Sequence, residues 1–415
     1  MNRNVRFLGF GAAIRALGVA MLVPFISIYL RKVVGLDYLS IGLLIIVIGI
    51  IPLFVSPFGG FVTDRIGRRK LFLIMLGIEA LSTGLIAVSM DLSSVLGIII
   101  AAGITNLAGG ALAGPALSAY TADLTTISER SQAFSWQRIG FNGGYTVGVI
   151  AGGFLTVAIG YAAAGYLASI IMGAGVVLLA MVLSASPYDV AKANGASSEG
   201  APASPGPSSV RASVRILARD RGFLLLCLAF FLADLAEAQW ANTLPLYVGT
   251  VLGLPNDILG IALALNGLVV FVGQARVTRW ATGHLHTSSA NAGIVLYVIS
   301  YLTLGALGLG WSGWGVVAVV MIAIVILTFG ENFAAIPQMT MPSNLAPSTE
   351  IGSYNGVFGL FAGAGYVFAP ALGGAALQAT SNTLLSWALM MIPAVPAFYL
   401  FSRLGRSLPK EANRV

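Results

Sequence analysis

The sequence predicts an all-α membrane protein with twelve transmembrane helices, arranged as two six-helix bundles related by pseudosymmetry. Hydrophobic residues make up 57% of the 415 positions and charged residues only 9%, whereas about 25% charged residues is usual in soluble domains. The mean hydropathy is +0.91. Apolar segments long enough to cross a bilayer, about 20 residues each, recur along the whole chain.

Each predicted element is one such apolar segment, and twelve follow one another in the sequence. Fifty-one glycines are spread among them, as expected where helices pack closely in lipid. The predicted spans are residues 7–30, 39–61, 70–90, 95–122, 132–158, 162–184, 222–250, 258–277, 289–309, 315–340, 352–378 and 383–403.

Basic residues between the spans predict the orientation of the chain. Cytoplasmic loops carry an excess of Lys and Arg. One alternating set of loops and termini holds most of them, and the opposite set holds only Arg31 and Lys32. The sequence therefore predicts a multi-pass protein of the cell (plasma) membrane with both termini in the cytoplasm. The net charge of +7 is scattered over these loops, which argues against a nucleic-acid partner.

A polar stretch divides the chain. Residues 187–213 are rich in Pro, Gly, Ser, Ala and Asn, a composition typical of a flexible linker. The predicted organisation is an N-terminal six-helix bundle (1–186), a cytoplasmic linker (187–221), a C-terminal six-helix bundle (222–405) and a cytoplasmic tail (406–415).

The two halves repeat each other. Tyr29…Gly35-Leu36…Gly42 in the first half recurs as Tyr247…Gly253-Leu254…Gly260 in the second. Transporters built from such repeats bind their substrate near the membrane midplane between the halves, and rocking of the halves gives alternating access. The repeat thus favours a transporter.

The charged string from Gly60 to Lys70, Gly-Phe-Val-Thr-Asp-Arg-Ile-Gly-Arg-Arg-Lys, lies between the second and third spans. The order Gly-x-x-x-Asp-Arg-x-Gly-Arg-Arg resembles the cytoplasmic signature of the major facilitator superfamily. Over essentially its whole length the chain looks like a member of that superfamily, closest to the twelve-span drug:proton antiporters, and the resemblance implies the major facilitator fold. It also implies a cytoplasmic gate formed by Gly60, Asp64, Arg65, Gly67, Arg68 and Asp123.

In this resemblance Asp64 lies near the start of the eleventh helix, around Gly352 and Ser353, where the helix dipole favours a carboxylate. Arg65 or Arg68 pairs with Asp123 at the cytoplasmic end of the fourth helix. These contacts hold the outward-open state. The alternative is that the charges only set the topology.

A glycine motif occurs once in each half. Gly144-x-x-x-Gly148-Val149-x-x-Gly152-Gly153 and Gly365-x-x-x-Ala369-Pro370-x-x-Gly373-Gly374 resemble the superfamily's antiporter motif, with Val149 in place of the usual proline in the first copy. Small residues four apart allow close helix contact. Export and simple helix packing both remain open as interpretations.

Ionisable residues inside spans are costly in lipid and are candidates for function. They are Arg15, Glu79, Arg138, Asp234, Glu237 and Glu331. The repeat places Arg15 opposite Ala233, so we expect Arg15 to meet Asp234 across the cavity, directly or through Glu237. Loss of that contact would let the acid take up a proton; the alternative is a static ion pair. Glu79 and Arg138 are expected to have structural or gating roles.

Further residues are assigned through the resemblance, in which the first, fourth, seventh and tenth helices line the cavity. Gly330-Glu331-Asn332…Pro337 resembles a segment of the tenth helix of drug:proton antiporters. An arginine that this family often carries on the fourth helix is replaced by Asn106, unless Arg15 substitutes for it. The remaining candidates on cavity helices are Gln239, Trp240 and Phe333.

The predicted function is secondary active transport by alternating access, with proton-coupled efflux of small amphiphilic or cationic compounds. An apolar cavity with three carboxylates favours such cargo. The alternatives are a proton-coupled symporter for a sugar or organic solute, for which Gln239, Asn242, Asn332 and Gln338 could serve, a lipid or lysolipid transporter, and a non-transporting sensor.

No enzymatic activity, cofactor or metal site is predicted. Cys227 is the single cysteine, His284 and His286 are the only histidines, and no phosphate-binding or dinucleotide-binding motif is present. The expected partners are the bilayer, a small-molecule substrate and protons, and the expected oligomeric state is a monomer.

Overall fold

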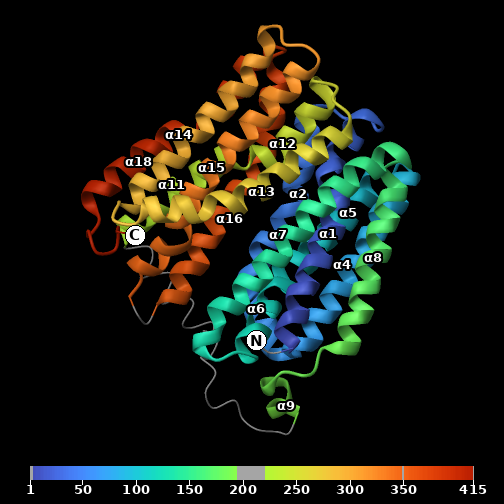
Figure 1. The fold of residues 1–415 in the computed structure, drawn as a ribbon, viewed down its shortest axis with the longest axis vertical. Helices are drawn as coiled ribbons and strands as arrows, with labels where there is room; N and C mark the ends of the chain where they lie inside the picture. Colours follow the sequence, from blue (N-terminus) through green and yellow to red (C-terminus); the bar gives the residue numbers. More distant parts are fainter. Residues whose placement is uncertain (1–2, 194–219, 348–349, 415) are drawn as a thin grey trace. The chain divides into compact units, whose positions relative to one another are not determined.

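The computed structural model describes residues 3–193, 220–347 and 350–414, and every regular element among them is a helix (Figure 1). Twelve helical segments are long and apolar enough to cross a membrane. They overlap all twelve predicted spans, so the predicted all-α fold is confirmed. The proline-rich part of the predicted linker, residues 194–219, lies outside the described residues.

The first six spans are built from ten helical elements. Helix α9 (Pro187–Ala193) follows them. The ten elements are α1 (Arg3–Lys32), α2 (Tyr38–Val55), η1 (Ser56–Phe58), α3 (Gly59–Ile66), α4 (Arg68–Asp91), α5 (Val95–Asn106), η2 (Leu107–Ala113), α6 (Gly114–Asp123), α7 (Ile127–Ala158) and α8 (Tyr161–Val182).

The last six spans also contain ten elements. They are α11 (Arg221–Glu237), α12 (Gln239–Leu246), η3 (Tyr247–Val251), α13 (Asn256–Ala281), α14 (His286–Gly305), η4 (Ala306–Leu309), α15 (Trp314–Leu345), α16 (Ile351–Ala379), α17 (Thr383–Met390) and α18 (Ala394–Ser407).

The described chain forms two compact units. Unit 1 consists of residues 1–35, 47–204 and 248–264, and unit 2 of residues 36–46, 205–247 and 265–415. Each unit therefore contains most of one sequence half and a short segment of the other. Within unit 1, α1, α4, α7 and α8 run side by side (Figure 1). Within unit 2, α11 packs against α16 and α18, and α14 against α15. The predicted bundle boundaries stay predictions.

Two spans are interrupted by π-helical segments, one in each half. The fourth span winds as a π-helix over Leu107–Ala113, and the seventh over Tyr247–Val251. Such wide turns occur frequently at functional sites, because they leave backbone carbonyls less regularly paired. The first segment and residues 248–251 of the second belong to unit 1, Tyr247 belongs to unit 2, and both segments lie in spans that the resemblance assigns to the cavity.

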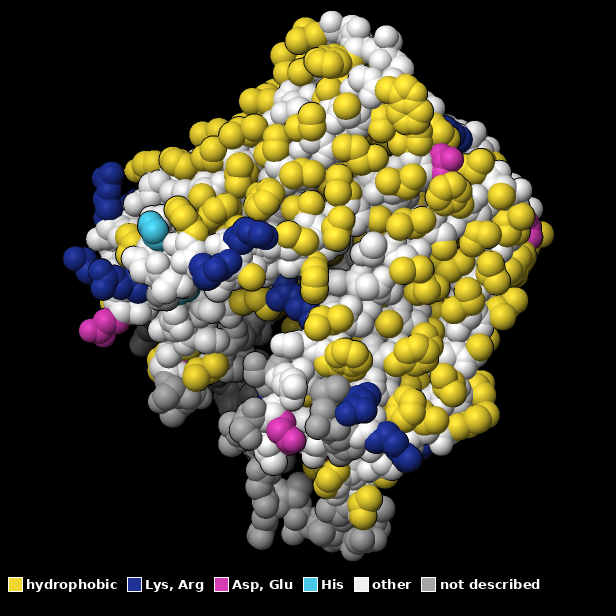
Figure 2. Space-filling model, in the orientation of Figure 1, with side chains coloured by type: hydrophobic (Ala, Val, Ile, Leu, Met, Phe, Trp, Pro, Cys, Tyr) yellow, Lys and Arg dark blue, Asp and Glu magenta, His cyan; other side chains and the backbone are white. Residues whose placement is uncertain are grey.

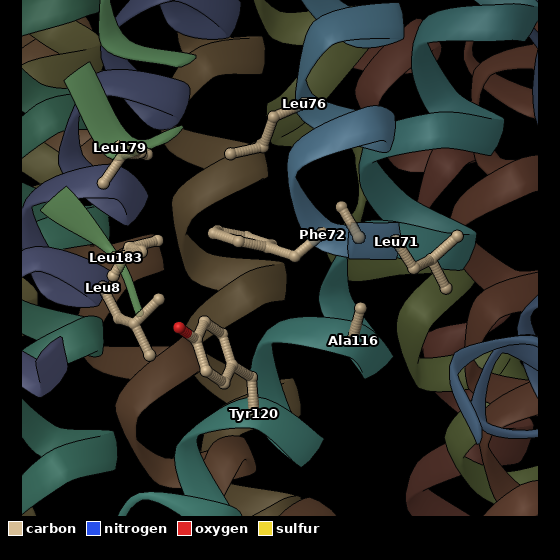
Figure 3. Close-up of a cluster of buried hydrophobic side chains, with 9 residues drawn as sticks. Leu8, Leu71, Phe72, Leu76, Ala116, Tyr120, Leu179 and Leu183 are labelled. Carbon is tan, nitrogen blue, oxygen red and sulfur yellow. The ribbon is translucent and has the colours of Figure 1, made fainter. Parts of the chain in front are cut away.

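The core of unit 1 is a cluster of large apolar side chains from five helices (Figure 3). Phe72 and Leu76 on α4 point toward Leu179 on α8 and toward Leu8 on α1. Tyr120 on α6 is fully buried beneath them, and its hydroxyl donates a hydrogen bond to the carbonyl of Ser184. Burying such side chains contributes about 1.5–3 kcal/mol each relative to exposure. This cluster holds α1 and α6 against α4 and α8.

The outer surface is apolar, as the composition predicts. Figure 2 shows hydrophobic side chains covering most of the face in view, with Lys and Arg side chains confined to a few places. Large side chains such as Leu81, Phe271 and Val395 are each 72% exposed, and all three lie on candidate spans. Soluble monomers rarely expose such continuous apolar surface, whereas lipid tails would cover it.

Candidate functional site

The charged string is a helical corner. The prediction of a loop from Gly60 to Lys70 is wrong: α3 continues to Ile66, Gly67 alone turns the chain, and α4 begins at Arg68. Gly67 has φ of +104°, in the left-handed region that side chains other than glycine rarely adopt. Its amide bonds the carbonyl of Thr63 at 3.0 Å, which ends α3.

Arg68 is the centre of this corner. Its guanidinium forms a salt bridge with Asp123 on α6 and approaches the Asp64 carboxylate to 3.6 Å. It also donates to the carbonyl of Ala119 at 3.1 Å and lies 4.2 Å from the centre of the Tyr188 ring. Of the two pairings that the resemblance implied for Asp123, the structure contains the one with Arg68.

Helix α9, which follows the sixth span, also contacts this corner. The Asp189 carboxylate accepts hydrogen bonds from the backbone amides of Arg68 at 2.8 Å and Arg69 at 3.1 Å. These are amides of the first turn of α4, which need partners outside the helix. The expectation of a flexible linker from residue 187 is therefore wrong for Pro187–Ala193, because Asp189 caps α4 and holds this helix in place.

Other predicted gate residues have simpler surroundings. Gly60 on α3 has open space where a side chain would project. The Arg69 guanidinium donates to the carbonyls of Leu183 and Ala180, at the end of α8. The expected neighbourhood of Asp64 and Gly352 joins the two compact units and stays a prediction.

Arg15 has its partner inside unit 1. Its Nε donates to Glu79 Oε2 at 2.7 Å, and the Glu79 side chain is 1% exposed. A Cβ at Gly109 would lie 1.9 Å from Glu79 Oε1 and 2.5 Å from Arg15 Nη2, so a larger residue there would displace the ion pair. The structural or gating role expected for Glu79 stays a prediction. The predicted meeting of Arg15 with Asp234 joins the two units and stays a prediction.

Asn106 ends α5 one residue before the π-helical segment. Its side chain is exposed and donates to the carbonyl of Ala102 at 3.3 Å. The Arg15 guanidinium lies beside Gly109, three residues further along the same span. Arg15 therefore lies close to this part of the fourth span, and its substitution for the arginine that the family often carries there stays a prediction.

An acidic cluster lies in unit 2. Asp234 and Glu237, three residues apart on α11, are 6% and 5% exposed, and Glu331 on α15 is partly buried. Glu237 and Glu331 lie close enough to interact directly. Among the described residues no Lys or Arg forms a salt bridge with any of the three acids. The cluster therefore has no counter-charge of its own.

Neutral polar groups surround these acids. Gln338 Nε2 lies 3.3 Å and 3.2 Å from the two carboxylate oxygens of Asp234, and Asn266 Nδ2 donates to Glu331 Oε2 at 2.7 Å. The side chains of Tyr366 and Trp240 approach the Glu237 carboxylate, which lies beside that of Glu331. The titratable groups that face the cluster from neighbouring helices are Tyr297 and Tyr301 on α14 and Tyr366 on α16.

The other candidates on these helices differ in their surroundings. Gln239 donates to the carbonyls of Leu235 and Ala369 and accepts from Thr243, so it joins α12 to α16. The Trp240 side chain approaches Glu237, and Asn332 Nδ2 is buried with no hydrogen-bond partner among the described residues. Phe333 packs edge-on against Trp280, 5.0 Å between ring centres.

Two residues of these sites are not singled out by the sequence. Asn266 is a neutral amide, which occurs in spans without function, and Asp189 lies in a segment whose composition is typical of a linker. Arg138, for which a structural or gating role is expected, lines an open hollow of unit 1 together with Arg15. A list of all polar residues in spans would have included Asn266.

The glycines of the two antiporter-type motifs lie where helices touch. In unit 1, a Cβ at Gly144, Gly148 or Gly152 would lie 2.0–2.4 Å from backbone oxygens of α1. In unit 2, a Cβ at Gly42 on α2 would lie 2.3 Å from the carbonyl oxygen of Pro370. Both motifs therefore serve close helix packing, and Pro370 lies at such a contact.

Two acids outside the spans show ordinary helix-capping electrostatics. Hydrogen bonds from the Ser40 amide at 2.9 Å and the Ser40 hydroxyl at 2.7 Å lower the pKa of Asp37, which precedes α2. Hydrogen bonds from the Thr126 amide and hydroxyl likewise lower the pKa of Glu129 in the first turn of α7. Charged carboxylates are favoured at helix starts.

The family model described as Major Facilitator Superfamily matches residues 8–370 of the chain. The protein is a member of the major facilitator superfamily. An uncharacterized MFS-type transporter of Bacillus subtilis, YqjV, is 24% identical over 369 residues, covering 88% of this chain and 84% of YqjV.

Shorter matches link this superfamily member to named resistance proteins. The quinolone resistance protein NorA of Staphylococcus aureus is 26% identical over 158 residues, 37% of this chain and 39% of NorA. Multidrug resistance protein 2 of Bacillus subtilis is 31% identical over 142 residues, 34% of each chain.

Solved structures share the fold of this superfamily member. The nucleoside transporter NupG superposes with a TM-score of 0.75 at 14% identity, over 98% of this chain and 99% of NupG. A POT family transporter in complex with 5-aminolevulinic acid superposes with a TM-score of 0.73 at 15% identity, over 98% and 96% of the two chains. Family and fold together make the protein a multi-pass membrane transporter of small molecules and not an enzyme.

Proposed function

We propose that this protein is a proton-coupled secondary transporter that exports small amphiphilic or cationic compounds by alternating access. The observation that carries the proposal is the acidic cluster of Asp234, Glu237 and Glu331, buried in membrane-spanning helices without a salt bridge among the described residues. The residues at both chain ends are proposed to face the cytoplasm of a cell whose plasma membrane holds the protein.

The cost of charge in this cluster supports proton coupling. Moving an ionised carboxylate out of water without a counter-charge costs several kcal/mol. Two adjacent acids such as Glu237 and Glu331 add mutual repulsion. A bound proton or a cationic group of the cargo can remove both the desolvation cost and the repulsion. If the acids always hold either a proton or the cargo, the transporter exchanges protons for cargo.

The groups around the acids support a cluster that gains and loses protons over one that stays protonated. Gln338 and Asn266 donate hydrogen bonds to Asp234 and Glu331, which favours their charged forms. The tyrosines at positions 297, 301 and 366 border the same acids and can donate or accept. The partial matches to NorA and Multidrug resistance protein 2 favour export as the direction.

The charged corner is the proposed cytoplasmic gate. Arg68 forms a salt bridge with Asp123 within unit 1 and lies 3.6 Å from Asp64. Gly144, Gly148 and Gly152 in unit 1 and Pro370 in unit 2 are the proposed helix-packing positions, each within its own unit.

The test is transport by purified protein in proteoliposomes with an imposed pH gradient. A fluorescent amphiphilic cation is the probe, and Asp234→Asn is the variant. We expect gradient-driven movement in the wild type and loss of it in Asp234→Asn with an unchanged melting temperature. Glu411→Gln, an exposed acid of the C-terminal tail, is the matched control and should transport normally.

The direction of flux decides between export and uptake. Movement of cargo against the proton flux supports the proposal. Movement with the protons would make the protein a symporter, and flux independent of the gradient would overturn proton coupling. Full driven transport by Asp234→Asn would remove the acidic cluster from the mechanism.

A further inference from the structure

Unit 1 contains an open hollow of about 270 Å³ between α1, α4, α6 and α7. Its polar lining comes from Arg15, Arg138 and Gln137, and its aromatic lining from Phe72, Phe134 and Phe141. All these residues belong to one compact unit, so the hollow is a feature of unit 1 by itself. The proposed proton coupling makes no use of it.

The charge of the hollow is positive. The Arg15 charge is balanced by Glu79, whose carboxylate lies 2.7 Å away. Arg138 is exposed and forms no hydrogen bond or ion pair with any residue that the structure describes. No acidic side chain lines the hollow. One full positive charge, that of Arg138, is therefore left for whatever enters.

The position of Arg138 is unusual for an uncompensated arginine. It lies on α7 inside the span Gln132–Ala158, where ionisable side chains are rare and mark substrate or ion pathways. Arg130, two turns earlier on α7, is also exposed but precedes that span. The two arginines share a helix, and only Arg138 lines the hollow.

The aromatic lining gives the hollow an apolar body. Phe72 is 1% exposed and forms part of the core cluster, as Figure 3 shows, so it is a fixed floor. Phe134 and Phe141 on α7 are 39% and 41% exposed and lie one turn on either side of Arg138. Gln137 is tied to Thr121 through its amide nitrogen, which keeps the polar wall in place.

We propose that this hollow binds cargo with an acidic group on a small aromatic body, the carboxylate on Arg138 and the ring among the three phenylalanines. This inference goes beyond the proposed function, because it adds amphiphilic acids, bound in unit 1, to the amphiphilic or cationic compounds proposed for the acidic cluster of unit 2. Arginine binds carboxylates through two parallel hydrogen bonds, which gives both affinity and orientation. The volume is slightly below the 300–1,000 Å³ usual for drug-sized ligands, which selects bodies of one or two rings.

The test is isothermal titration calorimetry of the purified full-length protein with 2-naphthoate and with 2-naphthamide. The two probes have the same ring and nearly the same size, and differ in charge. We expect 2-naphthoate to bind at least about tenfold more tightly, because hydrogen bonds between two charged groups are stronger than those to a neutral amide. Arg138→Gln should abolish this preference, and Arg138→Lys should retain part of it.

Arg130→Gln is the matched control, since it removes the same charge from the same helix outside the hollow. It should leave the preference for 2-naphthoate unchanged. The proposal is overturned if 2-naphthoate shows no saturable binding, if both probes bind equally, or if Arg138→Gln keeps the preference. An equal loss in Arg138→Gln and Arg130→Gln would also overturn it, because it would reveal only a long-range charge effect.

Calorimetry without a membrane gradient keeps this inference separate from the proposed function. Binding of 2-naphthoate through Arg138, with no pH-driven flux in proteoliposomes, would leave the site standing and remove proton coupling. Gradient-driven movement of a cation with no binding of 2-naphthoate would support proton coupling and remove the site at Arg138.

Discussion

In each half of the chain the fifth span packs against the first, but the contacts differ between α7 in the first half and α16 in the second. In unit 1, a Cβ at Gly140, Gly144, Gly148 or Gly152 on α7 would lie within 2.4 Å of a backbone oxygen of α1. In unit 2, a Cβ at Gly365 or Gly373 on α16 would first meet side chains of α11 and α12, namely Asp234 and Thr243. One interface joins backbone to backbone, and the other contains polar side chains.

The two interfaces also differ in whether their charged side chains are paired. On α1, Arg15 is neutralised by Glu79 inside its own unit. On α11, Asp234 and Glu237 have amide and tyrosine neighbours but no salt bridge in the described part of the chain. Among the described residues, the unit 1 interface thus combines backbone contacts with a paired charge, and the unit 2 interface combines polar side chains with acids that have no salt bridge.

The largest effect should come from breaking the balance in unit 1. Arg15→Gln leaves Glu79, 1% exposed, without its counter-charge and should destabilise the protein by about 3–5 kcal/mol. The double variant Arg15→Gln/Glu79→Gln should recover most of this loss, because it removes both charges. Melting temperatures in detergent measure both. A double variant as unstable as the single one would contradict the pairing.

A substitution in the glycine interface should have the next largest effect. Gly144→Ala places a Cβ 2.0 Å from the carbonyl oxygen of Ala13, so the helices must separate, at a cost of about 1–3 kcal/mol or more. Gly143→Ala on the same helix has no neighbour within 4 Å and should be harmless. Similar melting temperatures for the two variants would show that the helices are not in tight contact.

The equivalent substitution in unit 2 should cost less. Gly373→Ala places a Cβ 2.0 Å from Thr243 Oγ1, a side chain that can rotate away. The Thr243–Gln239 hydrogen bond of 2.6 Å is then lost, about 0.5–1.5 kcal/mol. Gly356→Ala, with no neighbour within 4 Å, is the control on α16. A larger loss for Gly373→Ala than for Gly144→Ala would reverse the comparison.

The smallest effect concerns the loop before α2, which begins in unit 2. The folded-state pKa of Asp37 is lowered below its ordinary value of 3.8 by Ser40. The stability that this contact contributes is present above that value and is lost as the pH falls through the lower, folded-state pKa. Asp37→Asn should flatten this acid dependence of the melting temperature and leave it little changed at pH 7. An unchanged acid dependence would show that Asp37 does not contribute.

The sequence was sufficient for the spans because their signal is local. A run of about 20 apolar residues has the same meaning wherever it occurs. The acids in spans were also found directly, since burial of charge is rare enough to mark Asp234 and Glu331 without a structure. The Arg68–Asp123 pair followed from the resemblance, because the family's motif carries both residues.

Partners that are distant in sequence could not be found in this way. Symmetry pointed Arg15 toward Asp234, but its partner within unit 1 is Glu79 on a helix that the repeat does not single out. Asp189 is 121 positions from Arg68, and the composition around it predicts a linker. Gln239 has the chemistry of a ligand group, yet its amide is bound to the carbonyl of Ala369. Such choices depend on packing that no local pattern records.

The contact between Asp189 and the start of α4 can form only late in the synthesis of the first half of the chain. The amides of Arg68 and Arg69 are made 121 and 120 residues before the carboxylate that caps them. At about 5–20 residues per second, the ribosome needs about 6–24 s to supply it. During that interval the corner at Gly67 has helices on both sides but lacks the cap from α9. Its completion therefore reports that the chain has been synthesised through the first six spans.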